Sequence, residues 1–335
     1  MHQRANFDNP NITTSKPRKM KTMNPIHTIH TIHTILGAGP VAKATINALL
    51  ARGLPVRVVH RSGTFPKQPG LEVVAADITD VTQLTQAFTG SAVVYMCATP
   101  AYHRWEQEFD AMMRNVLQAC AATGSAVVFA DNLYMYQESP NAPFSETTPL
   151  QPTTRKGVVR DRIAEMVLQA HRDGKVKTAI ARASDFFGPG VDNAMLGNRF
   201  FPQIIAGKTV QWFGNPDMPH TFSYVPDFGK ALVELGVDGM GWGEVWHVPS
   251  SITCTAREAA NATAALTQKP AKLKASGRLM LRLVGLFIPA AKEMIEMLPH
   301  FETPYVMDDS KWHSRMHTRT TPWDVALAET VFSYQ

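Results

Sequence analysis

Short apolar runs alternate with stretches of helical periodicity from residue 32 to about residue 184. The apolar runs predict strands within 32–39, 55–62, 71–78, 92–98, 125–131 and 175–184. Between them, helical patterns cover 41–53, the stretch ending near Gly90, 104–124 and 158–174. Because the strand runs are almost continuously apolar and helices separate them, the pattern predicts right-handed βαβ units and a parallel sheet covered on both faces.

The alternation ends after about residue 185. A loop-rich segment follows, 244–250 reads as one more strand, and the remainder reads as helix and loop. We therefore predict an α/β protein: a Rossmann-type doubly wound parallel sheet over 26–185, with strand 244–250 added. Residues 186–335 are expected to form mainly a smaller C-terminal substrate-binding lobe over the carboxyl edge of the sheet.

The basic balance of the chain is confined to its first residues. Of the net charge of +5, residues 1–25 hold +4, because five Lys and Arg residues there face Asp8 alone. We read 1–25 as a disordered basic leader and expect no nucleic-acid partner. The apolar stretch 279–291 is interrupted by Arg282 and Pro289 and is too short to span a membrane. Three cysteines, Cys97, Cys120 and Cys254, fit a reducing compartment, so a cytoplasmic location is expected.

A threonine–histidine repeat occupies residues 27–35. In an extended strand, His27, His30 and His33 alternate between the two faces. The repeat therefore predicts a strand entering the fold, and no metal site is expected there.

A glycine-rich turn follows the first predicted strand. Gly37, Gly39, Pro40, Val41 and Ala42 fit the pattern G-x-G-x-x-A, between a strand and a helix. Gly37 permits a tight turn, Gly39 lets backbone approach a pyrophosphate, and Ala42 permits close packing of the helix on the strand. The start of the helix offers free N–H groups and its positive dipole end to the anion, so a dinucleotide site is expected.

The end of the second strand bears on which nicotinamide cofactor binds. NAD sites usually carry an acidic residue there, whereas this chain has His60, Arg61 and Ser62. Arg61 can pair with a 2′-phosphate and Ser62 can donate to it, so NADP is favoured over NAD. At the third strand, Asp77 and Ile78 are placed to border an adenine ring, although Asp77 fits equally well as a helix N-cap.

The pattern resembles the extended and atypical short-chain dehydrogenase/reductases, the NAD-dependent epimerase/dehydratase family, over about 32–335. Besides the glycine turn, the segments that carry the resemblance are 76–78, 97–100, 129–136, 182–189 and 222–227. The resemblance implies a Rossmann-type fold and an NAD(P) cofactor. It also places Ala98, Thr99, Ser184 and Phe186 at the cofactor, and it makes Phe187 a candidate substrate contact in an apolar wall near the nicotinamide. The alternative for Phe186 and Phe187 is plain core. A small-molecule substrate and a homodimer are implied as well.

The chain departs from the family at the catalytic residues. The family uses a Ser or Thr, a Tyr, and a Lys four residues after the Tyr. Here the Ser/Thr position falls on Asn132, and residues 152–161 contain no tyrosine. Ungapped spacing puts Gly157 and Asp161 at the Tyr and Lys positions.

A shift of one residue puts Lys156 and Arg160 at those positions instead, on one helix face. We favour this register because it keeps cationic donors near the ribose and the reacting oxygen. A desolvated Lys156 beside other cations is a candidate general acid/base, and Asn132 can donate to a carbonyl oxygen. The alternative is that these are solvated first-turn residues.

Two tyrosines are further candidates for the missing phenol. As strand residues, Tyr134 and Tyr136 would point the same way. In the lobe that should face substrate, His220 is expected in a loop and is a candidate substrate contact.

Three functions remain open. The first is an NADP-dependent oxidoreductase acting on a small carbonyl or alcohol, with a non-standard catalytic site. The second is a non-catalytic NADP-binding sensor. The third is a nucleotide-sugar epimerase or dehydratase, which the absent tyrosine disfavours.

Overall fold

The structure, a computed structural model, describes residues 32–137, 142–276 and 295–335. The leader 1–25, the first two histidines of the repeat and the apolar stretch 279–291 lie outside the described residues. The third histidine, His33, is buried in the first strand, where its Nδ1 lies 3.1 Å from the hydroxyl of Tyr95.

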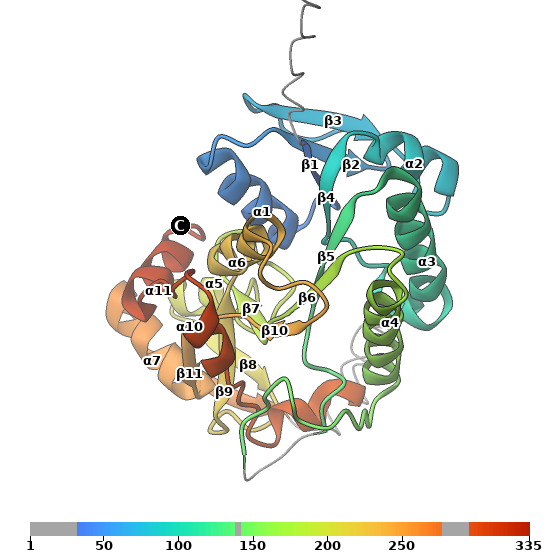
Figure 1. Cartoon of the computed structure of the whole chain (residues 1–335). Helices are drawn as coiled ribbons and strands as arrows, with labels where there is room; N and C mark the ends of the chain where they lie inside the picture. The colour runs from blue at the N-terminus through green and yellow to red at the C-terminus, as the bar shows by residue number, and fades with distance from the viewer. Residues whose placement is uncertain (1–31, 138–141, 277–294) are drawn as a thin grey trace, which may run out of the picture. The chain divides into compact units, whose positions relative to one another are not determined.

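A seven-stranded parallel sheet forms the centre of the fold (Figure 1). Its strand order is β10-β6-β5-β4-β1-β2-β3, and every neighbouring pair is parallel. The strands are β1 (Ile32–Leu36), β2 (Val56–His60), β3 (Leu71–Ala75), β4 (Ser91–Met96), β5 (Ala126–Asp131), β6 (Thr178–Arg182) and β10 (Val245–His247).

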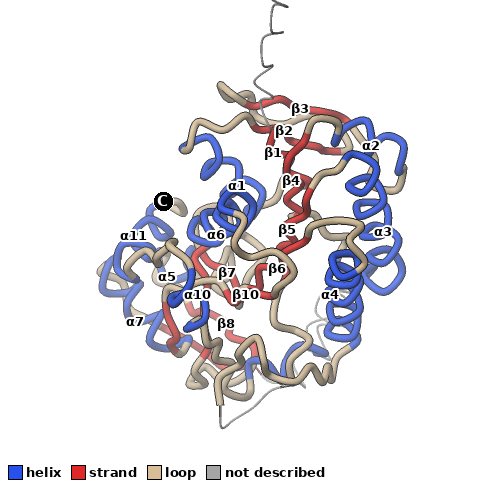
Figure 2. Tube along the Cα trace, viewed as in Figure 1, coloured by secondary structure: helices blue, strands red, loops and turns tan. Residues whose placement is uncertain are grey.

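Helices cover both faces of this sheet, as Figure 2 shows. Alternation along β5 explains why both faces are apolar: Val127 and Phe129 enter one core cluster and Val128 the other. The first cluster lies under α2 (Val81–Phe88), α3 (Trp105–Thr123) and α4 (Arg155–Arg172), and the second under α1 (Pro40–Ala51) and α6 (Val225–Asp238). The predicted doubly wound parallel sheet is thus confirmed.

The second half of the chain contains more strands than its sequence predicts. Two small sheets, β11-β9-β7 and β12-β8, lie outside the central one. With a third apolar cluster they form what we call the C-terminal lobe. The expectation of helix and loop alone is wrong because these strands are short, from three to five residues. The elements are β7 (Asp185–Phe187), α5 (Phe201–Ile205), β8 (Thr209–Phe213), β9 (His220–Tyr224), β11 (Ile252–Cys254), α7 (Ala256–Thr267), β12 (Lys272–Ser276) and α11 (Trp323–Phe332).

One helix of the segment predicted as the lobe belongs to the central sheet. Helix α6 falls in the segment predicted as the lobe, yet it packs on the central sheet and leads into β10. The remaining elements are the short 3-10 helices η1 (Tyr102–Arg104) and η2 (Leu298–Phe301), and α10 (Ser310–Arg315). In the described ranges, no helix combines the length and the apolar character that a membrane crossing requires.

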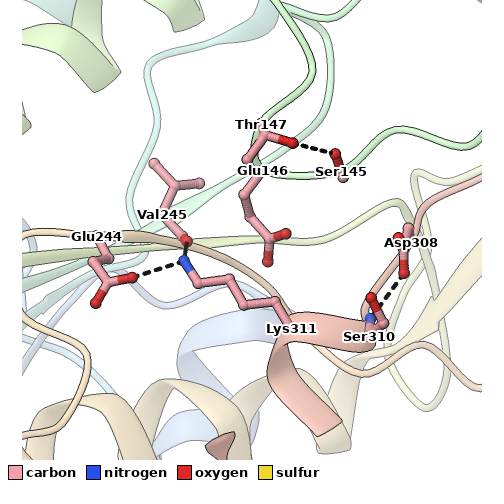
Figure 3. Close-up of a pocket in the computed structure, with 8 residues that line it drawn as sticks. All are labelled: Ser145, Glu146, Thr147, Glu244, Val245, Asp308, Ser310 and Lys311. Atoms are coloured by element: carbon pink, nitrogen blue, oxygen red, sulfur yellow. Dashed lines mark hydrogen bonds and ion pairs between the residues drawn. The ribbon is translucent and has the colours of Figure 1, made fainter. Parts of the chain in front are cut away.

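Side chains occupy the outer edge of β10. The Lys311 ammonium donates to the carbonyl oxygen of Val245 at 2.8 Å, and the N–H of His247 donates to the Glu146 carboxylate at 2.8 Å. Lys311 also forms an ion pair with Glu244 at 2.9 Å. Lys311, Glu244, Val245 and Glu146 are among the residues that line a cavity of about 680 Å³ (Figure 3). Side chains therefore bind the backbone groups of β10 to which a further strand would pair.

Candidate functional site

The glycine turn between β1 and α1 is shaped for close approach of a ligand. Gly37 has φ +123°, and a Cβ there would lie 3.0 Å from the backbone nitrogen of Ala98, in the loop after β4. Gly39 differs, because a Cβ added to it meets nothing within 4 Å. It is the N-cap of α1, and no side chain caps that helix. The open space before uncapped N–H groups fits a pyrophosphate.

The loops that follow β2 and β3 lie near each other, because these strands are parallel neighbours in the sheet and β2 also lies beside β1. His60 Nδ1 and Ser62 Oγ are 2.8 Å apart, and Arg61 is exposed. The Asp77 carboxylate accepts hydrogen bonds from the N–H and the hydroxyl of Thr79, which lower its pKa, and the Arg61 charge lowers it further. Arg61 is thus within electrostatic reach of Asp77.

The alternative role of Asp77 as a helix N-cap is wrong. The cap of α2 is Asp80, whose carboxylate accepts from the N–H groups of Thr82 and Gln83. Ile78 is half-buried and packs against the apolar cluster beneath α2 and α3. This leaves Asp77 in a turn at the carboxyl end of β3.

Lys156 lies in the first turn of α4 and is buried. The helix begins at Arg155, three residues before the predicted start, because the Thr154 hydroxyl accepts from the N–H of Gly157. Lys156 is 4% exposed, and its Nζ lies 4.3 Å from the centre of the Tyr102 ring and 3.7 Å from a carboxylate oxygen of Glu296. The alternative of a solvated first-turn charge is wrong for this lysine.

The two registers place different residues on the buried face of α4. Lys156 and Arg160 are both 4% exposed, whereas Asp161 is half-buried and burial raises its pKa. A Cβ on Gly157 would overlap the carbonyl oxygen of Tyr134 and lie 3.0 Å from Pro152 Cβ. The shifted register thus puts both cations inward, and the position assigned to tyrosine by ungapped spacing has no room for a side chain.

Arg160 belongs to a buried cluster that the sequence did not reveal, which we call the Asp131 network. Its guanidinium lies 3.2 Å from the Asp131 carboxylate and 4.3 Å from the Trp105 ring. The other Asp131 oxygen accepts from Arg182 at 3.1 Å, and Arg182 also donates to the Tyr136 hydroxyl at 2.8 Å. Asp131 and Trp105 thus enclose the guanidinium of Arg160, and its contact with the cofactor stays a prediction.

The two candidate tyrosines lie apart because β5 ends at Asp131. The chain turns at Asn132, whose side-chain oxygen accepts from the N–H of Tyr134 at 3.2 Å. Tyr136 is fully buried and its hydroxyl lies 2.9 Å from His247 Nε2, within the Asp131 network. The expectation that both tyrosines share one direction is therefore wrong, and Tyr136 is held as a structural residue.

Tyr134 lies on the same side of α4 as Lys156. Its ring stacks on Trp105 and lies 5.5 Å from the His300 ring. The hydroxyls of Tyr134 and Tyr102 share a hydrogen bond. Burial raises the pKa of both phenols well above its ordinary value, and the charge of Asp185 raises each further. Both phenols are accordingly neutral at physiological pH.

Asp185 and His220 lie at ion-pair distance. Of the two residues, the sequence indicates only His220 as a candidate. His220 Nε2 lies 2.8 Å from the Asp185 carboxylate. The histidine begins β9 and is buried, with its ring stacked on Phe301 at 4.9 Å, so the expected loop position is wrong. The Asp185 side chain remains 21% exposed. Asp185 was missed because one acidic residue at a strand end carries no distinctive pattern.

The remaining expected residues flank these groups. Ala98 and Thr99 follow β4, where Ala98 is half-buried and Thr99 is exposed. The N–H of Ser184 donates to Ser223 at 3.1 Å, and Phe186 packs against Phe228 of α6. Phe187 is fully buried between Tyr224 and Trp323 in the core of the C-terminal lobe, so its expected substrate contact is not met. Within the described ranges, no group of three or more His, Cys, Asp or Glu side chains is arranged to hold a metal.

Two solved structures of similar fold are enzymes acting on nucleotide sugars. UDP-glucose 4-epimerase from Thermus thermophilus, solved with NAD, has a TM-score of 0.73 at 19% identity, covering 91% of this chain and 99% of that one. The dTDP-glucose 4,6-dehydratase DesIV from Streptomyces venezuelae, solved with NAD, has a TM-score of 0.73 at 17% identity, covering 91% and 97%. At these identities the likeness shows the fold alone.

The sequence comparisons lead to the family. The 3beta-hydroxysteroid-dehydrogenase/decarboxylase isoform 2 of Arabidopsis thaliana is 23% identical over 179 residues. The match spans 49% of this chain but only 30% of that protein. The profile of the NAD dependent epimerase/dehydratase family matches residues 34–238, more than half of the chain. The resemblance found in the sequence is thereby confirmed: this chain belongs to the NAD-dependent epimerase/dehydratase family.

Proposed function

We propose that this chain is an NADP-dependent oxidoreductase that interconverts a small carbonyl compound and its alcohol, with Lys156 in place of the usual tyrosine. The observation that carries the proposal is the buried ammonium of Lys156 in the first turn of α4, beside Tyr102 and Tyr134. When bound, the nicotinamide supplies or accepts the hydride. Lys156 then holds the substrate oxygen by a hydrogen bond and provides the proton that this oxygen gains on reduction.

The cofactor would be held by residues on three neighbouring loops. Gly37 and Gly39 give the pyrophosphate access to the N–H groups of Val41 and Ala42 at the start of α1. Arg61 and Ser62 would bind the 2′-phosphate, and the proximity of Arg61 to Asp77 supports an adenosine site there.

A nucleotide-sugar epimerase or dehydratase is the second candidate. It is supported by the likeness to structures of such enzymes over about nine-tenths of the chain. The missing side chain at Gly157 weighs against it, because the family's tyrosine has no counterpart at that position. The absence of that tyrosine also supports the third candidate, a non-catalytic NADP-binding sensor.

One experiment separates the three functions. Calorimetric titration with NADPH and NADH is followed by a screen of aldehydes and ketones for NADPH consumption, and by incubation of UDP-glucose with NAD. Turnover of a carbonyl that is lost in Lys156→Met, with NADPH binding retained, supports the oxidoreductase. Conversion of UDP-glucose supports the second candidate. Tight NADPH binding without any turnover identifies a sensor and refutes the role of Lys156.

The homodimer and the cytoplasmic location belong to the same proposal. Light scattering on the purified full chain tests the first, and imaging of the tagged chain tests the second.

A further inference from the structure

The carboxylate of Glu296 lies against the start of α4, although it comes from the far end of the chain. It precedes η2, in the C-terminal part, and contacts residues 140 and 141 positions earlier. One oxygen accepts from the N–H of Lys156 at 3.1 Å, and the other accepts from Arg155 at 3.0 Å and lies 3.7 Å from Lys156 Nζ. Both the backbone and the side chain of one lysine thus contact the same carboxylate.

The surroundings of this contact limit how Lys156 can move. The Lys156 ammonium lies between the Tyr102 ring, 4.3 Å away, and the Glu296 carboxylate. The Glu296 side chain is 14% exposed, so solvent screens the pair only in part. The start of a helix also attracts a negative group through its dipole and its N–H groups. Two faces of the ammonium are therefore fixed by groups from different parts of the chain.

Arg155 shares Glu296 but plays a different part. Its side chain is 60% exposed and also reaches Glu106 of α3 at 3.5 Å. It anchors the outer side of the carboxylate, whereas Lys156 meets the inner side. Tyr102, His103 and Trp105, from η1 and the start of α3, line a small cavity together with the two cations and Glu106.

We infer that Glu296 is a positioning residue, which holds the Lys156 ammonium over Tyr102 in the orientation needed to meet a substrate oxygen. The inference rests on the proposed function, because it gives Lys156 its catalytic role. It also means that the C-terminal part of the chain contributes to catalysis without touching the substrate. Glu296 is then part of the active-site framework, although it lies 140 residues after Lys156 in the chain.

The test compares Glu296→Gln, Glu296→Asp and, as a matched control, Glu302→Gln, which removes an exposed carboxylate from the same segment. Full-length protein with ¹³C-labelled lysine is studied by NMR, and the missing signal in Lys156→Met identifies Lys156. In the wild type and in the control, the two Hε protons of Lys156 give separate signals because the ammonium is immobilised. In Glu296→Gln they merge, and Glu296→Asp restores part of the separation.

Kinetics complete the test with any carbonyl substrate that the screen identifies. Glu296→Gln is expected to lower kcat about tenfold or more, with KM and the NADPH dissociation constant unchanged, and Glu296→Asp to recover part of the loss. Separate Hε signals or an unchanged kcat in Glu296→Gln overturn the inference. If the wild type shows no turnover at all, the proposed function fails, while the Lys156 signals still decide whether Glu296 positions the lysine. Unchanged NADPH affinity shows that each variant is folded.

Discussion

The carbonyl oxygen of Tyr134 occupies the space that a Cβ on Gly157 would need. The backbone after β5 therefore packs directly on the first turn of α4, where Thr154 Oγ is also only 3.0 Å from that Cβ position. This contact fixes the separation between Tyr134 and α4. Lys156 and Arg160, four residues apart on α4, share the buried face of the same helix.

Gly157→Ala is expected to destabilise the protein by about 1–3 kcal/mol, because the methyl group must displace backbone atoms. Urea denaturation measures the change in the free energy of unfolding. Gly157→Tyr should unfold at a still lower urea concentration, because its larger side chain meets the same backbone atoms. A Gly157→Tyr variant as stable as the wild type would show that the family's tyrosine fits here after all.

Alanine substitutions at the two glycines of the cofactor turn should affect different properties, namely cofactor binding at Gly39 and stability at Gly37. Gly39→Ala places its methyl group in open space, so we expect an unchanged melting temperature and at least about tenfold weaker NADPH binding. Gly37→Ala forces φ +123° on alanine and brings its Cβ to 3.0 Å from Ala98, so a loss of about 1–3 kcal/mol in stability is expected. Calorimetry and thermal melts test both. Equal NADPH affinity in Gly39→Ala and the wild type would contradict the pyrophosphate site.

Arg61→Ala is expected to weaken NADPH binding about 10–100-fold while leaving NADH binding unchanged, because a charged hydrogen bond to the 2′-phosphate is lost. Isothermal titration with each nucleotide measures the difference. Arg52→Ala is the matched control, since Arg52 lies at the other end of α1 and forms an ion pair with Asp238. A parallel loss for both nucleotides would contradict the NADP assignment.

Asp131→Asn should cost about 3–5 kcal/mol of stability, because it leaves two buried guanidinium groups with less compensation. Denaturant titration provides the measurement. Asp217→Asn removes an exposed partner of Arg257 and is expected to leave the unfolding midpoint unchanged. Similar midpoints for the two variants would show that the Asp131 network carries little of the stability.

Acid should destabilise the protein through His247. Burial, together with the charge of Arg182, lowers the pKa of His247 to about 3 in the folded chain, whereas the ordinary value is 6.5. Unfolding therefore takes up a proton at any pH between these values, so the free energy of unfolding falls by up to about 1.4 kcal/mol for each pH unit below 6.5.

His247→Gln should remove most of that slope, and unfolding measured between pH 7 and pH 5 tests it. His33, whose pKa is also lowered by burial, contributes in the same direction, so His33→Gln is the comparison variant. An unchanged slope in His247→Gln would contradict the buried neutral state.

The parallel sheet and the glycine turn were predictable because their signals are local. An apolar run, a Gly-x-Gly turn and an amphipathic helix depend on neighbours within a few residues, and β1 through β6 follow those signals. The start of α4 was placed too late because a threonine N-cap, Thr154, is easily missed before a glycine. Contacts between distant residues left no pattern in the sequence, as for Glu296 with Lys156 and for His220 with Asp185.

The guarded edge of the central sheet bears on how copies of this chain can associate. The outward carbonyl of Val245 and the outward N–H of His247 are each engaged by a side chain. A strand from a second molecule would have to displace Lys311 and Glu146 before it could extend the sheet at that side. Self-association by edge pairing at β10 is thus opposed, and of the two edges of the central sheet only the one formed by β3 is without this guard of Lys311 and Glu146.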